Sequence, residues 1–190
     1  MSTAVCRNIK KPSLFTPPAT VIQSAIMTLT CQPIGVIRTP FVNLTGMPIQ
    51  PPGAADAIGT IELLPDFHAG LQDLEDFSHL ILLYHFHLSQ GFALTVMPFL
   101  DTQPHGVFAT RAPRRPNPIG LSIVRLQRIE KGTLYVEGVD MLDGTPLLDI
   151  KPYVPAFDAA TAVAIGWLVQ TAQQVTEQKA DGRFQDTGAS

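Results

Sequence analysis

The residues best suited to chemistry lie in a proline-rich segment, residues 109–120. Arg111, Arg114, Arg115 and Asn117 stand there among three prolines that fall within six residues. Proline fixes φ, removes a backbone donor and pushes the preceding residue towards extended geometry. The segment is therefore expected to be a stiff loop that loses little entropy when a ligand binds. Its arginines are suited to bind a phosphate or a carboxylate.

Charge is distributed unevenly along the chain. Lys and Arg number 13 against 16 Asp and Glu, a net charge of −3 that in bulk argues against a nucleic-acid binder. No Lys or Arg lies between Arg38 and Arg111, whereas residues 111–131 hold six of the 13 cations. This basic block is either a solvated face that balances the acidic stretch or a binding site, and two blocks in a dimer could serve RNA.

Histidines and cysteines offer little support for a metal site. His85 and His87 are two residues apart and would share one strand face, but no third ligand is evident. We interpret His79 as a structural histidine. Cys6 and Cys31 form neither a disulfide framework nor a zinc site, which indicates a reducing, cytoplasmic compartment.

The elements that must position these residues are short strands separated by Pro and Gly turns. The expected strands are residues 33–41, 58–64, 80–86, 94–100, 106–110, 122–129, 134–139 and 147–153. Apolar residues in 67–77 have helical spacing, Gly132 and Asp143-Gly144 predict turns, and a short helix is expected to begin at Gly166. This pattern predicts a mainly β fold, a small antiparallel β-barrel with a few short helices.

The chain divides into three expected parts. Residues 1–28 are predicted to be a flexible N-terminal extension, with Met27 a possible natural start. Residues 29–158 form the β-barrel domain, and residues 159–190 form a C-terminal helix and tail whose last dozen polar residues are expected to fray. No run reaches the ~20 apolar residues of a membrane helix, so no membrane association is expected.

Four ordered blocks carry a resemblance to a known family. They are Pro33-Ile34-Gly35-Val36-Ile37, the Phe77-Ser78-His79-Leu80 block, the Ala-Thr-Arg to Arg-Pro-Asn-Pro-Ile-Gly run of residues 109–122, and the Asp-Gly-Thr-Pro and Asp-Ile-Lys-Pro-Tyr run of residues 139–153. Over residues 32–158 the chain resembles the TsaA-like (TrmO) family. The resemblance implies a β-barrel methyltransferase that uses S-adenosylmethionine, modifies N6 of threonylcarbamoyladenosine next to the anticodon of tRNA, and forms a homodimer with the cofactor near the subunit interface. The chain has no Gly-x-Gly-x-x-Gly fingerprint of a Rossmann fold.

The resemblance also assigns site residues. Those matched to cofactor binding are Pro48, Ile49, Gln50, His87, Leu88, Arg111, Leu121, Asp143, Gly144 and Thr145. Those matched to the signature, with roles divided between cofactor and RNA, are Arg114, Arg115 and Asn117. Ile49 stands where many members have Arg, so that contact must be made by the backbone or be absent. Only 35 residues follow Pro155, which is too few for the C-terminal domain of longer members, so the chain resembles a short form.

Methyl transfer from a sulfonium needs alignment and, for a nitrogen conjugated to a carbonyl, a base. His87 and Asp143 are the candidate bases, although Asp143 could equally bind cofactor hydroxyls or shape its turn. Two alternatives stay open. One is an S-adenosylmethionine-binding module without catalysis, and the other is a methyltransferase acting on another RNA or a small molecule.

Overall fold

The computed structural model describes residues 29–184. The expected N-terminal extension, residues 1–28, lies outside the described residues, and so do Met27, Cys6 and the last six residues. The larger compact unit of the chain begins at Gln32. Cys31 is an exposed free thiol.

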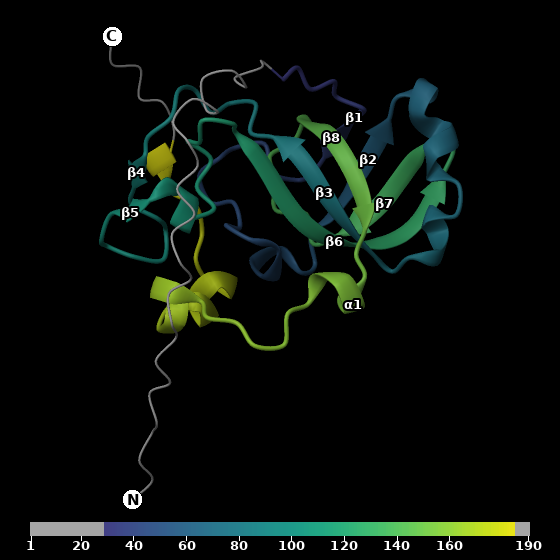
Figure 1. The fold of residues 1–190 in the computed structure, drawn as a ribbon. Coiled ribbons are helices and arrows are strands. Elements are labelled where there is room, and N and C mark those ends of the chain that lie inside the picture. The colour runs from purple at the N-terminus through teal and green to yellow at the C-terminus, as the bar shows by residue number, and fades with distance from the viewer. Residues whose placement is uncertain (1–28, 185–190) are drawn as a thin grey trace, which may run out of the picture. The chain divides into compact units, whose positions relative to one another are not determined.

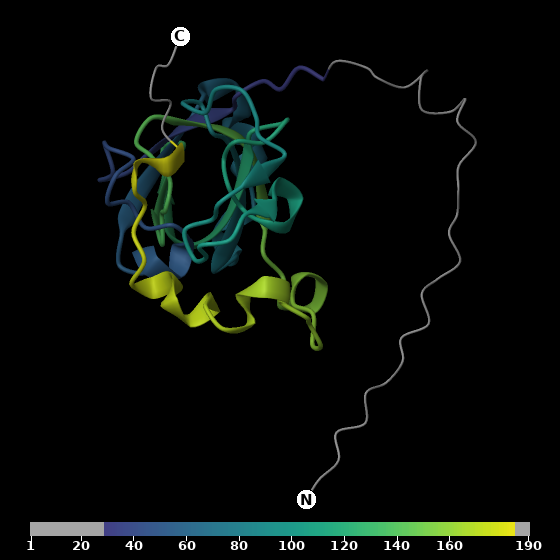
Figure 2. The ribbon, with the colours of Figure 1, turned by 90° about the vertical axis from the view of Figure 1, so that its left-hand side faces the viewer.

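Six antiparallel strands close into a barrel in the order β1-β2-β7-β6-β3-β8 (Figures 1 and 2). The strands are β1 (Gly35–Arg38), β2 (Ile58–Leu63), β3 (His79–His85), β6 (Ile119–Glu130), β7 (Thr133–Glu137) and β8 (Thr145–Pro152). Every neighbouring pair is antiparallel. The predicted mainly β, antiparallel barrel is confirmed.

Alternation along the strands fills the interior of the barrel with side chains. In β3, Leu80, Leu82 and Tyr84 are buried, and in β6 the buried residues are Gly120, Ser122, Val124 and Leu126. Period-two alternation is the pattern of a strand with one face on a core. The apolar side chains of the barrel core that have no exposed surface are Ile37, Ile61, Leu80, Leu82, Leu134, Val136, Val139 and Leu147, and burial of each contributes about 1.5–3 kcal/mol of transfer free energy.

A smaller cluster packs beside the barrel. It is built from β4 (Thr95–Val96), β5 (His105–Gly106) and the 3₁₀ turn η5 (Val107–Ala109) around buried Val96, Val107 and Ala112. The strands expected over 94–100 and 106–110 are much shorter than predicted. Pro98 cannot donate to a ladder, so pairing stops after Val96.

Residues 67–77 do not form the α-helix that their apolar spacing suggested. They form 3₁₀ turns, η3 (Pro65–Leu71) and η4 (Leu74–Asp76), separated by Asp73 in the left-handed conformation with φ of 63°. Phe67, Leu71 and Leu74 nevertheless pack on the barrel core, so their spacing indicated burial and not an α-helix. A further 3₁₀ turn, η2 (Pro51–Ala54), lies between β1 and β2.

The short helix expected to begin at Gly166 is present as a 3₁₀ helix, and the rest of the C-terminal region is a series of short turns. A four-residue helix α1 (Pro155–Asp158) is followed by η6 (Gly166–Val169), η7 (Ala172–Thr176) and η8 (Gly182–Phe184). Residues 179–184 are not frayed, because Ala180 exchanges backbone hydrogen bonds of 2.7 and 2.8 Å with Gly46 and Met47, and Arg183 donates to the Pro98 carbonyl at 2.7 Å. Within residues 29–184, no helix is long and apolar enough to cross a membrane.

Candidate functional site

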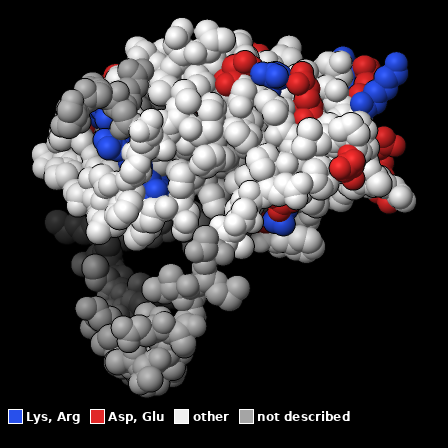
Figure 3. Space-filling view, turned by 90° about the horizontal axis from the view of Figure 1, so that it is seen from above, with Lys and Arg blue, Asp and Glu red and all other residues white. Residues whose placement is uncertain are grey.

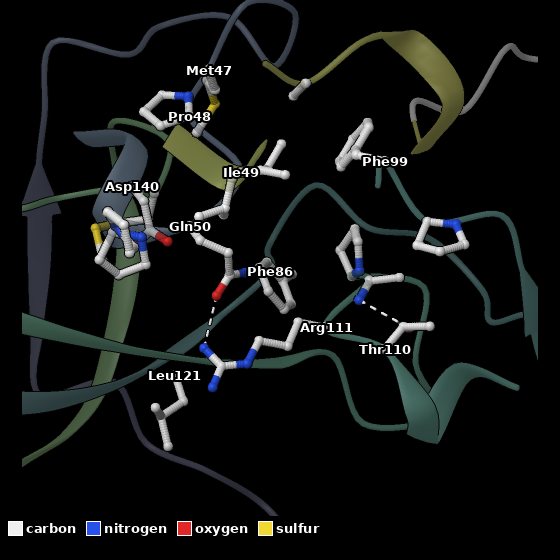
Figure 4. A pocket seen from close by; sticks show the side chains of 18 of the residues that line it. Met47, Pro48, Ile49, Gln50, Phe86, Phe99, Thr110, Arg111, Leu121 and Asp140 are labelled. Atoms are coloured by element: carbon white, nitrogen blue, oxygen red, sulfur yellow. Dashed lines mark hydrogen bonds between the residues drawn. The ribbon is translucent and has the colours of Figure 1, made fainter. Parts of the chain in front are cut away.

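A cavity of about 1230 Å³ lies against the barrel (Figure 4). Its wall combines the loop around Met47–Pro52, the end of β3 with residues 86–89, residues 108–113, the outward side of β6 and the C-terminal turns. Ligand sites are typically apolar cavities of roughly 300–1000 Å³ with a few placed polar groups. This cavity is large enough for a cofactor together with part of a substrate.

Eight of the ten residues matched to cofactor binding line this cavity. They are Pro48, Ile49, Gln50, His87, Leu88, Arg111, Leu121 and Thr145. They come from five separate stretches of sequence, and the fold brings them to one wall. Asp143 and Gly144 are not among the lining residues.

Arg111 and Gln50 connect two of these stretches. The Arg111 Nη1 donates a 2.7 Å hydrogen bond to Oε1 of Gln50, and Figure 4 shows both side chains extending into the cavity. Thr110 supports Arg111 from behind, since its hydroxyl donates to the Val107 carbonyl at 2.9 Å and accepts from the Ala112 amide at 3.2 Å. The stiff loop predicted from its prolines therefore presents a fixed cation to the cavity.

Arg115 has a different position. Its Nη1 donates to the carbonyls of Val107 at 3.0 Å and Thr110 at 2.9 Å, so it holds the loop that carries Arg111. Within the described chain, Arg114, Arg115 and Asn117 are not part of the cavity wall. Asn117 is exposed, and its carbonyl accepts from the Ile119 amide at 2.8 Å. Their role in RNA binding stays a prediction.

Two arginines of the basic block, residues 111–131, pair with neighbouring acidic residues. Arg125 pairs with Glu137 at 3.4 Å, while Arg128 pairs with Glu130 at 2.8 Å and stacks over Tyr135. These pairs are exposed, so each adds little stability. Figure 3 shows charged side chains of both signs at one end of the face seen from above and a smaller group, mostly Lys and Arg, at the other end, with uncharged residues covering the surface between them. The block is therefore not one continuous basic surface.

Asp143 joins its turn to β1. Its Oδ1 accepts from the Thr39 amide at 3.0 Å, and its Oδ2 lies 3.7 Å from Arg38 Nη1. Gly144 has a φ of 77°, which favours glycine, and buried Thr145 donates to the Leu142 carbonyl at 2.7 Å. These contacts favour the turn-shaping role for Asp143 over that of a base.

The histidines also differ from their expected arrangement. β3 ends at His85, and the His87 amide donates to the His85 carbonyl at 2.8 Å, so the two do not share a strand face. Partial burial and the neighbouring His85 lower the pKa of His87, which keeps its imidazole neutral. His79 lines the cavity, with Nδ1 2.9 Å from the Ser78 hydroxyl. Among the described residues, no group of three or more metal-ligating side chains is present.

A buried polar chain at the cavity was missed by sequence reasoning. Ser122 donates a 2.6 Å hydrogen bond to Oδ1 of Asp140, and the Tyr84 hydroxyl lies 3.0 Å from the Ser122 hydroxyl. Tyr84 and Asp140 both line the cavity. Burial raises the pKa of Asp140 to about 6, although the Ser122 hydrogen bond and the charge of Arg111 oppose this rise. One sequence signal was present: Ser122 is polar at an inward position of β6.

The C-terminal turns complete the wall. Trp167 lines the cavity, donates from Nε1 to the Ala109 carbonyl at 2.8 Å, and stacks on His105 with ring centroids 4.5 Å apart. Phe184 packs edge-on against Phe99 at 5.0 Å. Residues expected to be a helix and a tail thus form part of the site.

Comparison with known proteins gives one family. The profile described as "tRNA-methyltransferase O N-terminal domain" matches residues 36–159. A relative from Pyrococcus abyssi, named probable S-adenosyl-L-methionine-binding protein, is 52% identical over 80% of this chain and 83% of its own. The Mus musculus tRNA (adenine(37)-N6)-methyltransferase is 36% identical over 72% of this chain and 33% of its own.

Solved structures agree with this result. A crystal structure of TrmO from Pseudomonas aeruginosa superimposes with a TM-score of 0.63 and 46% identity, covering 74% of this chain. The present chain spans 63% of that solved chain.

Proposed function

Because the chain belongs to the tRNA-methyltransferase O family, we propose that it is an S-adenosylmethionine-dependent methyltransferase. Its substrate in this proposal is N6 of threonylcarbamoyladenosine next to the anticodon of tRNA. The observation that carries the proposal is the gathering of eight matched cofactor residues on one cavity wall, from segments far apart in sequence. The name of the mouse relative, a tRNA adenine-37 N6-methyltransferase, supports the nucleoside position.

The chemistry of the cavity fits the cofactor. Phe86, Phe99 and Leu121 offer apolar surface for an adenine ring, and Arg111 offers a cation for a carboxylate. We assign to cofactor binding Pro48, Ile49, Gln50, His87, Leu88, Arg111, Leu121 and Thr145, with Asp143 and Gly144 shaping the turn before Thr145. When bound, S-adenosylmethionine supplies an electrophilic methyl carbon on a positively charged sulfur. The protein contributes alignment and exclusion of water.

We assign tRNA contact to Arg114, Arg115 and Asn117, which lie in the proline-rich segment of residues 109–120. Arg115 already donates from Nη1 to two backbone carbonyls, so its contact with RNA would be made by its other donors. Phosphate contacts by arginine would make binding dependent on salt.

Two measurements test this function. Calorimetry with S-adenosylmethionine should give binding at tens of micromolar or tighter, and Arg111→Ala should weaken it. Mass spectrometry of tRNA nucleosides from a strain lacking the gene should then show unmethylated threonylcarbamoyladenosine, restored by the intact gene. Unchanged methylation in the deletion strain would contradict the tRNA assignment.

A second candidate function is cofactor binding without catalysis. The printed name of the Pyrococcus relative, an S-adenosyl-L-methionine-binding protein, favours it. Cofactor binding without methyl transfer to tRNA, another RNA or a small molecule would support this alternative.

We further propose a cytoplasmic homodimer. Leu121 and Ile123 expose apolar surface on the outward side of β6, and Phe108 adds an exposed ring at the same cavity. A second copy packed there would cover this surface and complete the cavity wall. Light scattering after gel filtration tests the assembly, and Ile123→Lys should shift a dimer to monomer.

A further inference from the structure

The chain of Tyr84, Ser122 and Asp140 is a polar group within an apolar barrel. Ser122 is 1% exposed and Tyr84 is 4% exposed, and their neighbours inside the barrel are leucine and valine side chains. Buried hydroxyls cost free energy unless they are hydrogen-bonded, and apolar residues fill such positions without that requirement. The fold therefore gives no reason for these hydroxyls, whereas the cavity beside them does.

The direction of the hydrogen bonds is fixed by chemistry. An ionised carboxylate can only accept, so Ser122 donates its single proton to Oδ1 of Asp140. The Tyr84 hydroxyl, 3.0 Å away, must then donate to Ser122. Burial and the charge of Asp140 raise the pKa of Tyr84, so it keeps the proton that it donates.

Gly120, the last residue of the Arg-Pro-Asn-Pro-Ile-Gly run, leaves the space that the Tyr84 ring occupies. Gly120 pairs with Tyr84 across β6 and β3, and a Cβ at Gly120 would overlap the tyrosine ring. The glycine of the Arg-Pro-Asn-Pro-Ile-Gly run is thus needed for Tyr84 to reach Ser122. Figure 4 shows the outcome, with the carboxylate of Asp140 turned into the space shared with Gln50.

We propose that Asp140 is the catalytic residue that accepts the N6 proton of the substrate, and that Ser122 and Tyr84 are positioning residues that hold its carboxylate at the cavity. This inference rests on the methyl transfer proposed above. In the step, N6 forms a bond to the methyl carbon while the carbon–sulfur bond breaks and its electron pair stays on sulfur. The N6 proton passes to Asp140, which becomes a neutral acid and later releases the proton to water.

The surroundings of Asp140 suit this role. Burial raises its pKa, while Ser122 and the positive charge of Arg111 keep it low enough for the carboxylate to be mostly ionised at neutral pH. A base is most effective when its pKa lies near the working pH. The other titratable side chains of the cavity wall are Asp56, His79, Tyr84, His87, Arg125, Glu137 and Asp181.

His87 is the rival base. Its pKa is lowered by partial burial and by the neighbouring His85, and the hydrogen-bond partner of its imidazole is the His85 backbone. In Asp140 a second side chain, Ser122, orients the carboxylate, and Tyr84 in turn contacts Ser122. A base oriented by a further side chain is the common arrangement in enzymes, which is why we assign the proton to Asp140.

The test compares Asp140→Asn with Asp149→Asn, an identical change at a half-exposed carboxylate of β8 that does not line the cavity. Single-turnover methyl transfer to tRNA carrying threonylcarbamoyladenosine should fall on the order of 100-fold or more in Asp140→Asn. It should be unchanged in Asp149→Asn. Calorimetry should show that Asp140→Asn still binds S-adenosylmethionine, and circular dichroism should show that it is folded.

A second arm needs no turnover. Carbon NMR of the unliganded protein should show Asp140 titrating near pH 6, and at higher pH in Ser122→Ala, because the donated hydrogen bond is lost. The pH at which the methyl-transfer rate falls to half on the acid side should rise by the same amount in Ser122→Ala. In Tyr84→Phe, the NMR titration midpoint of Asp140 and this rate midpoint should also rise, but by less.

The outcomes are separable. A folded, cofactor-binding Asp140→Asn that transfers at the wild-type rate overturns the role of Asp140, most directly if His87→Ala is inactive. A Ser122→Ala variant whose NMR titration moves while its rate profile does not also overturns it. A wild-type protein that binds cofactor and methylates no tRNA contradicts the proposed function itself.

Discussion

Arg111 donates a 2.7 Å hydrogen bond to the side-chain oxygen of Gln50, which lies 61 residues earlier in the chain. This contact fixes a cation at the cavity and connects the loop of residues 48–50 to the proline-rich segment that carries Arg111. The pair therefore links the fold of the barrel loops to the binding of the cofactor.

Arg111→Ala should weaken S-adenosylmethionine binding by about 10-fold or more, because a hydrogen bond to a charged group contributes about 1.5–3 kcal/mol. Gln50→Ala should weaken it less, because the cation remains. Calorimetry at one pH checks both, with Arg128→Ala on the β6–β7 hairpin as the control. Equal affinities for Arg111→Ala and the control would contradict the assignment.

Substitutions of Arg114 and Arg115 should have different effects on cofactor affinity and on tRNA affinity. Arg115→Ala should weaken cofactor binding several-fold as well as RNA binding, since Arg115 holds the carbonyls of Val107 and Thr110 beneath Arg111. Arg114→Ala should lower tRNA affinity and reduce its salt dependence by about one counterion, with cofactor affinity unchanged. Filter binding at several salt concentrations, alongside calorimetry, measures both quantities. The assignment fails if Arg114→Ala weakens cofactor binding as much as Arg115→Ala.

Asp140→Asn should stabilise the protein at neutral pH. The folded-state pKa of Asp140 is raised to about 6 from 3.8, so the folded protein binds the proton more tightly than the unfolded chain. Stability from this group is full below the unfolded value and declines as pH rises through the folded value. The gain at pH 7 should be at most about 3 kcal/mol, because one unit of pKa shift corresponds to about 1.4 kcal/mol, and it should vanish near pH 3. Urea unfolding at both pH values measures it, and a loss of stability at pH 7 would contradict the burial of a charged carboxylate.

Gly120→Ala should destabilise the barrel by about 1–3 kcal/mol, because the added methyl group forces Tyr84 away. The Tyr84–Ser122 hydrogen bond should lengthen at the same time, which raises the pKa of Asp140. Thermal unfolding and an NMR titration of Asp140 check the two effects, with Gly106→Ala as the control because no atom lies within contact of its Cβ. Wild-type stability in Gly120→Ala would show that the tyrosine can move without cost.

Much of this architecture could be predicted from the sequence. Alternation in residues 119–130 and the turn at Gly132 identified β6 and its hairpin, where Lys131 and Gly132 both have positive φ. Such turns are strongly specified by local chemistry. Apolar spacing in residues 67–77 did not distinguish 3₁₀ turns from an α-helix, because both bury residues three apart.

The site was less predictable for a physical reason. Arg111 and Gln50 could be named from motifs, but their contact depends on how loops close over the barrel. The pKa of Asp140 is raised by burial in the folded chain, while a hydrogen bond from Ser122, on β6, lowers it, so neither effect could be read from the residues around position 140. The C-terminal turns join the wall through Trp167 and the Ala109 carbonyl, a contact between residues 58 positions apart that no local pattern specifies.

The most direct test of the account is methyl transfer by the purified protein. Threonylcarbamoyladenosine-containing tRNA is incubated with the protein and S-adenosylmethionine carrying an isotopically labelled methyl group, and the digested nucleosides are analysed by mass spectrometry. The account predicts one labelled methyl group on threonylcarbamoyladenosine with the wild-type protein, and almost none with Asp140→Asn. Unlabelled threonylcarbamoyladenosine after incubation with a wild-type protein that binds the cofactor would contradict it.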